Sequence, residues 1–378
     1  QAQAMAAGAI DISAVMNTAS LLMANGSGNP VVIINGVSHP ADTFAIVSAK
    51  GKPLTVKELK GKKIAGPRGT VLHQLMVAAL KSEGMSAKDV IAAVAAGPAS
   101  TEPNAVIVWS LRLPMALTAL LVGASLSLAG LSIQTITANA LASPSTLGIT
   151  SGASFGAAIA ITGGLTLFGE LWAGTITAAF IAALLICLLI LLLGRLKGMS
   201  PATLILAGII MNFFFVALQQ LLIYLASPET AQLINGWTFG NLERAGWLST
   251  AAAGAALLLG LPCAWQLTSL SVGEERAKSL GVPVARLRVI VFSAASVLVA
   301  ASVSFIGTIA FVGLVAPHCA KLLLGDDQRW LIPGSILFGG FIMLLSSLVA
   351  KWLSAGAMLP IGIVTSIAGV PFLLVLLL

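Results

Sequence analysis

Long apolar runs separated by short polar connections fill the chain from about residue 113 onward. A helix needs about 20 apolar residues to cross the hydrocarbon core of a bilayer. Nine runs reach or approach that length, and they predict transmembrane helices at 113–134, 148–164, 172–194, 202–226, 247–267, 287–305, 308–324, 331–353 and 359–378. The second and seventh runs are short or rich in glycine. Small residues recur within the runs and allow close approach of helix backbones in lipid, so the pattern predicts a packed bundle.

Residues 1–104 follow a different pattern, in which short β-type runs alternate with helical ones. Strands are expected at 31–34, 44–47 and 62–65, a helical turn at 54–59, and a helix from 71 to about 84. Residues 98–103 have the composition of a linker. The predicted fold is therefore mainly α: a polytopic helical membrane bundle of about nine transmembrane helices with a small N-terminal α/β fragment. The expected divisions are 1–97, a linker at 98–110, and a membrane domain at 111–378.

The composition agrees with two parts in different solvents. Hydrophobic residues make up 58% of the chain and charged residues 9%, whereas a soluble domain carries about 25% charged residues. Nine of the twenty Lys and Arg residues and six of the thirteen acidic residues lie in 1–104. This excludes an ordinary globular protein. Cys187, Cys263 and Cys319 stand singly in or beside apolar runs, which favours buried apolar residues over a metal or redox site.

The formal net charge of +7 does not indicate nucleic acid, because the basic residues of the membrane part lie in short loops that orient helices in a bilayer. If residue 112 lies outside, the inner connections carry Arg195, Lys197, Arg276, Lys278, Arg286, Arg288, Lys321 and Arg329. The outer connections then carry only Arg112, Arg244 and Lys351. This asymmetry predicts an external N-terminal region and a cytoplasmic C-terminus. The chain opens with Gln1, and no basic-then-apolar leader precedes residue 20.

Six sequence blocks in order resemble the FecCD permease family, which imports ferric siderophores, haem and cobalamin. They comprise 111–114 with 121–124 and 128–130, then 139–144 with 147–153, then 236–242, 273–282, 307–318, and 359–366 with 369–372. The chain departs from the family at Ala140, where Pro is usual, and at Lys321, where Arg is usual. A typical member also begins with one more transmembrane helix, which gives ten. The first block here resembles the second of those helices, so residue 112 is expected outside.

The resemblance implies an ATPase-coupling helix in the polar loop 268–286, formed by Gly273, Glu274, Glu275, Arg276, Ala277, Lys278, Leu280 and Gly281. A merely solvated loop is the plainer interpretation. The chain contains no G-x-x-x-x-G-K-[ST] motif, so ATP must be bound by a separate polypeptide. The expected partners are two ATPase subunits, a second permease copy in a homodimer or pseudo-dimer, a periplasmic substrate-binding protein and membrane lipid. No cofactor, metal, catalytic residue or nucleic acid is expected.

Polar residues within the apolar runs are candidates for the translocation pathway, because such groups usually face the interior of a bundle. They are Gln134, Asn139, Asn212, Gln219 and Gln220, together with Pro317 and His318. Hydrogen bonding between helices is an equal alternative for the amides. Pro317 is expected to break or bend its helix, and His318 is better explained as a structural hydrogen bonder than as a metal ligand. Arg244 is a candidate for docking the binding protein, or simply a solvated side chain.

Residues 1–93 resemble part of a second family, the periplasmic binding proteins for sulfonates, nitrate and thiamine precursors. The resemblance lies in 6–13, 54–65, 67–73 and 79–90. An anion site is predicted where Gly69 and Thr70 open a helix, with Thr18 and Ser20 facing it; a plain helix cap is the alternative for Thr70. Three interpretations stay open: a natural fusion whose front is cut off, a remnant domain with a new role, and an artificial join of neighbouring genes.

The predicted function is the permease subunit of an ATP-binding-cassette importer that moves an iron chelate of the siderophore, haem or cobalamin class across the inner membrane by alternating access. The N-terminal resemblance favours a small anion such as a sulfonate instead, or an anion-binding module fused to a membrane domain. A passive channel would not need residues 273–282. An enzyme is disfavoured, because the membrane part has no catalytic constellation.

Overall fold

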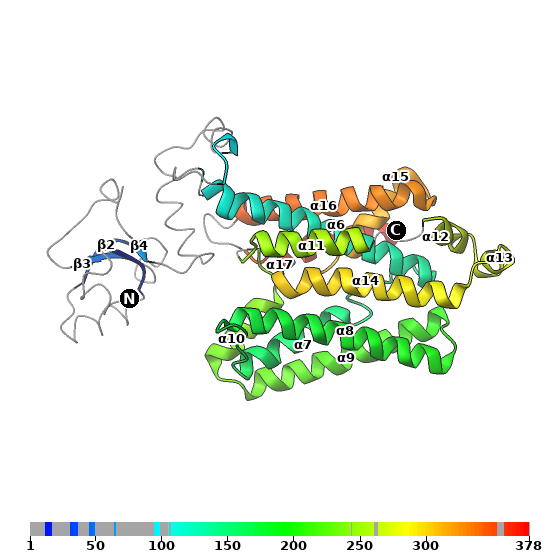
Figure 1. Cartoon of the computed structure of the whole chain (residues 1–378), viewed down its shortest axis with the longest axis horizontal. Helices are drawn as coiled ribbons and strands as arrows, with labels where there is room; N and C mark the ends of the chain where they lie inside the picture. The colour runs from blue at the N-terminus through cyan, green and yellow to red at the C-terminus, as the bar shows by residue number, and fades with distance from the viewer. Residues whose placement is uncertain are drawn as a thin grey trace. The chain divides into compact units, whose positions relative to one another are not determined.

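The computed structural model describes residues 12–16, 31–36, 45–49, 64–65, 94–98, 105, 107–242, 244–260, 264–353 and 359–377. The chain forms two compact units, one made mainly of residues 1–111 and the other of residues 112–354 and 359–378. Figure 1 draws the elements of both.

The N-terminal unit contains a four-stranded sheet. Its strands are β1 (Ile12–Met16), β2 (Val31–Gly36), β3 (Ala45–Ala49) and β4 (Ile64–Ala65), in the order β2-β3-β1-β4. The β1–β3 and β2–β3 pairs are antiparallel, and the β1–β4 pair is parallel. The strands expected at 31–34, 44–47 and 62–65 are confirmed. The turn at 54–59, the helix at 71–84, and the anion-site residues Thr18, Ser20, Gly69 and Thr70 lie outside the described residues.

The second unit is a helical bundle, and each of the nine expected membrane segments contains a helix (Figure 1). They are α6 (Leu113–Thr137), α7 (Ile149–Thr162), α8 (Leu171–Lys197), α9 (Pro201–Leu225), α11 (Trp247–Leu259), α14 (Val284–Ile306), α15 (Val312–Leu324), α16 (Gln328–Leu353) and α17 (Ile361–Leu377). A one-turn π-helix, η2 (Val108–Arg112), precedes α6. Among the described residues, five spans are long and apolar enough to cross a bilayer, and four apolar helices are shorter.

The bundle also contains three short helices besides the nine that match the expected segments. The expected 247–267 segment contains α11 and part of a separate helix, α12 (Ala264–Ser271), and Pro262 lies between them in the sequence. The helix α13 (Glu274–Ser279) occupies the polar loop, where a short helix was expected. The helix α10 (Pro228–Thr238) was missed. It begins with the same Ser-Pro-x-Thr signal as α9: the hydroxyl of Ser200 or Ser227 accepts the N–H three residues on, and Pro occupies the first turn.

The helix α6 forms the centre of the bundle and packs against α11, α14, α15 and α16. Glycines bring the backbones together. A Cβ at Gly123 would collide with the carbonyl oxygen of Gly339 in α16, and one at Gly130 would collide with that of Gly313 in α15. Close backbone approach of this kind supplies the van der Waals packing that holds helices together in lipid. A second group, α7, α8 and α9, packs onto the first through α14.

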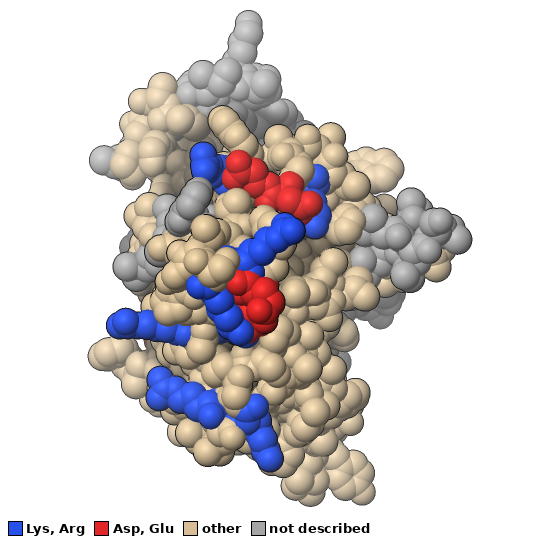
Figure 2. Space-filling model, turned by 90° about the vertical axis from the view of Figure 1, so that its right-hand side faces the viewer, with Lys and Arg blue, Asp and Glu red and all other residues tan. Residues whose placement is uncertain are grey.

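The two ends of the bundle differ in chemistry. The C-terminal ends of α6, α8 and α15, the N-terminal ends of α14 and α16, and α13 lie at one end, the right-hand end in Figure 1. Figure 2 shows Lys, Arg, Asp and Glu side chains gathered on this face. Trp172, Trp247 and Trp352 belong to helix ends at the other side, where tryptophan suits a membrane–water interface. We call the first face the charged end and the second the aromatic end.

Candidate functional site

The short helix α13 is the most distinctive structural feature of the charged end. Gly273 before it and Gly281 after it have φ angles of 126° and 80°, which L side chains rarely adopt. The two glycines therefore turn the chain sharply on both sides of a single helical segment. Ala277 is buried, whereas Glu275, Arg276, Lys278 and Leu280 are exposed. The result is a projecting, charged helix on an otherwise apolar protein, visible at the right of Figure 1.

A single buried arginine of α14 fastens this helix to the bundle. Arg288 has only 4% of its surface exposed. Its Nη2 donates to Glu274 Oε2 of α13 at 2.7 Å, its Nε donates to the Ile136 carbonyl oxygen near the end of α6 at 3.1 Å, and its Nη1 donates to the Met199 carbonyl oxygen between α8 and α9 at 3.1 Å. One guanidinium group thus joins α14 to the adjacent α13 and to two segments that are distant in sequence, the end of α6 and the α8–α9 connector.

The electrostatics at Glu274 follow from these contacts. The hydrogen bond from Arg288, and then that from Lys278, holds the pKa of Glu274 below its ordinary value of 4.5. The Lys278 Nζ lies 2.9 Å from Glu274 Oε1, and this contact raises the pKa of Lys278. Glu274 is therefore ionised at neutral pH and compensates the buried charge of Arg288.

Two of the predicted pathway amides bond to neighbouring helices. Asn212 of α9 accepts a hydrogen bond from the Ser151 hydroxyl of α7. Gln219 of α9, which is 7% exposed, donates through Nε2 to the Thr238 hydroxyl of α10 at 3.0 Å. These contacts match the alternative interpretation, in which the amides join helices.

The other predicted pathway residues are placed differently. Asn139 accepts from the N–H of Leu141 at 2.9 Å and so caps a turn after α6. Gln134 has a buried Nε2 for which no hydrogen-bond partner is found. Gln220 is exposed on α9. A role of these five amides in the translocation pathway stays a prediction.

Pro317 and His318 lie inside α15, which runs from Val312 to Leu324. The helix continues through Pro317, so the predicted break does not occur there, and the alternative, a bend at Pro317, stays a prediction. Pro317 cannot donate to the carbonyl oxygen of Gly313 four residues earlier, and that same oxygen lies against Gly130 of α6. His318 stacks edge-on against Phe372 of α17, with ring centroids 6.3 Å apart. No group of three metal-ligating side chains occurs among the described residues.

A junction of three connectors near the aromatic end was not predicted. The N–H of Asn241 donates to the Ile306 carbonyl oxygen at 2.6 Å, and the N–H groups of Ile361 and Gly362 donate to the carbonyl oxygens of Gly240 and Phe239 at 3.0 and 3.1 Å. These bonds link the α10–α11, α14–α15 and α16–α17 connections. Because they join backbone groups, the side-chain pattern carries almost no signal for them.

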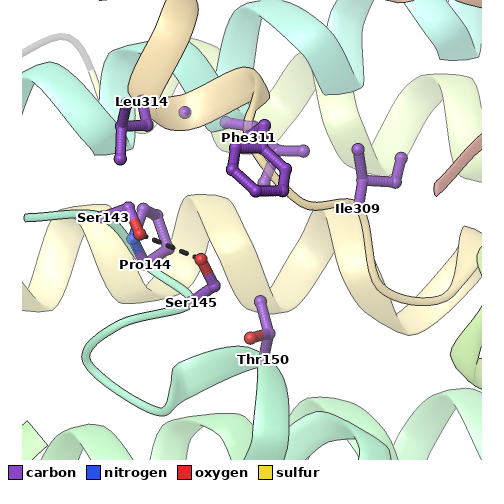
Figure 3. A pocket seen from close by; sticks show the side chains of 9 residues that line it. Ser143, Pro144, Ser145, Thr150, Ile309, Phe311 and Leu314 are labelled. Atoms are coloured by element: carbon purple, nitrogen blue, oxygen red, sulfur yellow. Dashed lines mark hydrogen bonds between the residues drawn. The ribbon is translucent and has the colours of Figure 1, made fainter. Parts of the chain in front are cut away.

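A small cavity lies between the connector after α6 and the α14–α15 connector (Figure 3). Ser143, Ser145, Thr150, Ile309 and Phe311 are among its lining residues, and the hydroxyls of Ser143 and Ser145 are 2.9 Å apart. Its volume is about 10 Å³, which is room for roughly one water molecule. This cavity is too small for a metal chelate.

Arg244 stands in the connection after α10, with its guanidinium carbon 4.2 Å from the centroid of the Trp172 ring of α8. It is exposed. The electron-rich face of an indole ring attracts a cation, and this contact helps to fix the position of Arg244.

Comparisons with known proteins place these features in context. The family model described as the FecCD transport family matches residues 70–378, and that described as NMT1/THI5 like matches residues 1–105. An ABC transporter permease protein of Methanocaldococcus jannaschii is 40% identical over 284 residues, which cover 72% of this chain and 81% of the relative. The hemin transport system permease protein HmuU of Yersinia pestis is 35% identical over 318 residues, which cover 82% and 94%. A solved structure described as an inward-facing conformation of a metal-chelate type ABC transporter has 33% identity and a TM-score of 0.68, covering 77% of this chain and 95% of that one.

Proposed function

Because this chain belongs to the FecCD transport family, we propose that it is the membrane-spanning permease subunit of an ATP-binding-cassette importer for an iron chelate. The observation that carries the proposal is α13: a charged helix that projects from the bundle and is fixed to it by the buried Arg288. Such a helix offers a contact for a soluble motor subunit, whereas a passive channel has no use for it. The chain is a transport subunit and an inner-membrane protein.

The printed names of relatives support an iron chelate as the substrate class. The Yersinia pestis relative is a hemin permease, and the solved neighbour is a metal-chelate transporter. An iron chelate of the siderophore, haem or cobalamin class would be too large for the cavity of Figure 3. We therefore place the translocation pathway between two permease copies. The face of α9 that carries Phe213, Phe214 and Gln220 is exposed and apolar enough to form part of that interface.

The assembly would contain two ATPase subunits at the charged end and an external binding protein at the aromatic end. This orientation puts the eight Lys and Arg residues of the charged end in the cytoplasm. It also leaves Arg244, stacked on Trp172, facing the binding protein. The N-terminal region is then external and the C-terminus cytoplasmic. Domain divisions at 1–97, 98–110 and 111–378 fit this arrangement.

A second candidate is an importer of a small anion such as a sulfonate. The match of residues 1–105 to the NMT1/THI5-like model favours it, and so does the resemblance of those residues to sulfonate-binding proteins. The predicted anion site at Thr18, Ser20, Gly69 and Thr70 belongs to this candidate. Under it, the N-terminal unit would recognise the substrate.

The two candidates are separated by uptake into proteoliposomes that contain the chain, its ATPase and its binding protein, with ATP on the ATPase side. The probes are iron-loaded desferrioxamine, haemin, cyanocobalamin and taurine. We expect accumulation of one of the first three. Accumulation of taurine alone would replace the iron-chelate proposal with the small-anion one, and accumulation of none would refute both.

A further inference from the structure

The contacts of Arg288 differ from those of the other described basic residues at the charged end. Lys278, Lys321 and Arg329 also form ion pairs, but these three basic side chains are between 51% and 61% exposed. The Arg288 side chain is only 5% exposed. Exposed pairs are screened by water and contribute little. A buried guanidinium keeps its geometry because its donors are arranged in a rigid planar fork.

The three acceptors of this fork belong to three different segments. Glu274 begins α13, Ile136 is in the last turn of α6, and Met199 follows α8. Met199 has a φ of 45°, a conformation that is unusual outside glycine. This backbone arrangement directly precedes α9 and presents the Met199 carbonyl oxygen to Arg288.

Separation of α13 from α14 would leave the charge of Arg288 buried without its carboxylate partner. Removing one partner of a buried ion pair is strongly unfavourable, because the remaining charge is neither hydrated nor compensated. Moving α13, α14, the end of α6 and the α8–α9 connector together avoids that cost. The ion pair therefore opposes separation of α13 from α14.

We propose that Arg288 is a positioning residue that transmits displacement of α13 into the bundle, with the Glu274–Arg288 ion pair kept intact through the transport cycle. The proposal rests on the proposed function, since it assumes that an ATPase displaces α13. Arg288 does not touch substrate or ATP. It sets how much of the motor's movement reaches α6, α9 and α14.

The test compares Glu274→Gln with Asp326→Asn in the full complex in proteoliposomes. Glu274→Gln keeps the side-chain shape and removes the charge, and the residue is accessible enough (35% side-chain exposure) that the bundle should still fold. Asp326→Asn removes an exposed ion pair with Lys321, formed at 2.6 Å on the same face. The readouts are ATPase assembly, thermal stability in detergent, and chelate molecules transported per ATP hydrolysed.

We expect Glu274→Gln to assemble with the ATPase and hydrolyse ATP while its transport per ATP falls by about tenfold, because a neutral amide holds the Arg288 guanidinium less tightly than a carboxylate does. Asp326→Asn should match the wild type. Arg288→Lys, which keeps the charge without the fork, should give an intermediate ratio.

Two results would overturn the proposal: an unchanged ratio for Glu274→Gln in a complex that assembles, or loss of ATPase binding by Glu274→Gln, which would make Glu274 a direct contact of the motor. A wild-type complex that transports no chelate would instead refute the proposed function itself.

Discussion

The packing of α6 against α16 makes a sharp prediction for Gly123→Ala. A Cβ at this position would collide with the Gly339 carbonyl oxygen and would lie 2.6 and 2.7 Å from Cγ and Cβ of Met343. Rotation about χ1 moves Cγ of Met343, but neither the Cβ of Met343 nor the backbone oxygen of Gly339 can move without displacing α16. Relief of the clash therefore requires the two helices to separate.

The size of the destabilisation by Gly123→Ala follows from the type of contact. Overpacking a tight site costs roughly 1–3 kcal/mol, and a collision with backbone belongs at the upper end, about 3 kcal/mol. At roughly 2–4 °C per kcal/mol, the value for domains of about 150–250 residues, the melting midpoint should fall by about 6–12 °C. The matched control is Gly254→Ala in α11, where the new Cβ would lie 3.6 Å from Leu121 Cδ1, an ordinary contact with the same central helix.

Thermal melting of both variants in one detergent, followed by size-exclusion chromatography, measures the difference. Replacing glycine by alanine inside a helix favours folding by about 0.5–1 kcal/mol, so Gly254→Ala should melt at or slightly above the wild-type midpoint. If Gly123→Ala melted together with Gly254→Ala, the close approach of α6 and α16 would be wrong.

Three further predictions follow. Thr118→Val removes the buried hydrogen bonds from α6 to the hydroxyls of Ser249 and Thr250 at 3.1 and 2.8 Å, so the melting midpoint should fall by about 2–4 °C; an unchanged midpoint would show that these bonds add no net stability. Gln219→Leu removes the α9–α10 bond, so amide hydrogen exchange should accelerate in α10 but not in α7; equal rates in wild type and variant would count against it. The pKa of Glu274 is lowered, first by Arg288, so the contribution of Glu274 to stability is present above pH 4.5 and is lost as pH falls through the lowered value. The difference in melting midpoint between wild type and Glu274→Gln should therefore be constant above pH 4.5 and shrink below it. A constant difference at all pH values would contradict this assignment.

The sequence predicts those features of the fold that a pattern of neighbouring residues specifies. Apolar length located the nine membrane segments, and β-type runs located β2, β3 and β4. The helix at 274–279 was expected from the family resemblance of the block 273–282, and the structure gives both flanking glycines positive φ angles. Each of these signals lies within a few consecutive residues.

The features that sequence could not predict depend on contacts between distant segments. In the sequence, Arg288 is recognisable only as one of the loop charges that orient the bundle in a bilayer. Two of its three acceptors are backbone oxygens, 152 and 89 residues away, and every residue has such an oxygen. Polarity likewise indicated that Asn212 and Gln219 face the interior, but it did not identify Ser151 and Thr238 as their partners.

The helix α10 was missed for a different reason. Its eleven residues are too few and too polar for a membrane span, so hydropathy gives no signal for this helix. The Ser-Pro-x-Thr signal at 227–230 was nevertheless present, and it is the same signal that opens α9. Attention to capping residues rather than hydropathy would have located this helix.

We propose above that this chain carries substrate inward while another subunit hydrolyses ATP. The most direct measurement is chelate concentration inside proteoliposomes that hold the complete complex, with hydrolysable ATP or a non-hydrolysable analogue supplied to the ATPase. Accumulation above the external concentration is expected with ATP and none with the analogue. Equilibration to the external concentration under both conditions would identify a passive channel and contradict the proposal.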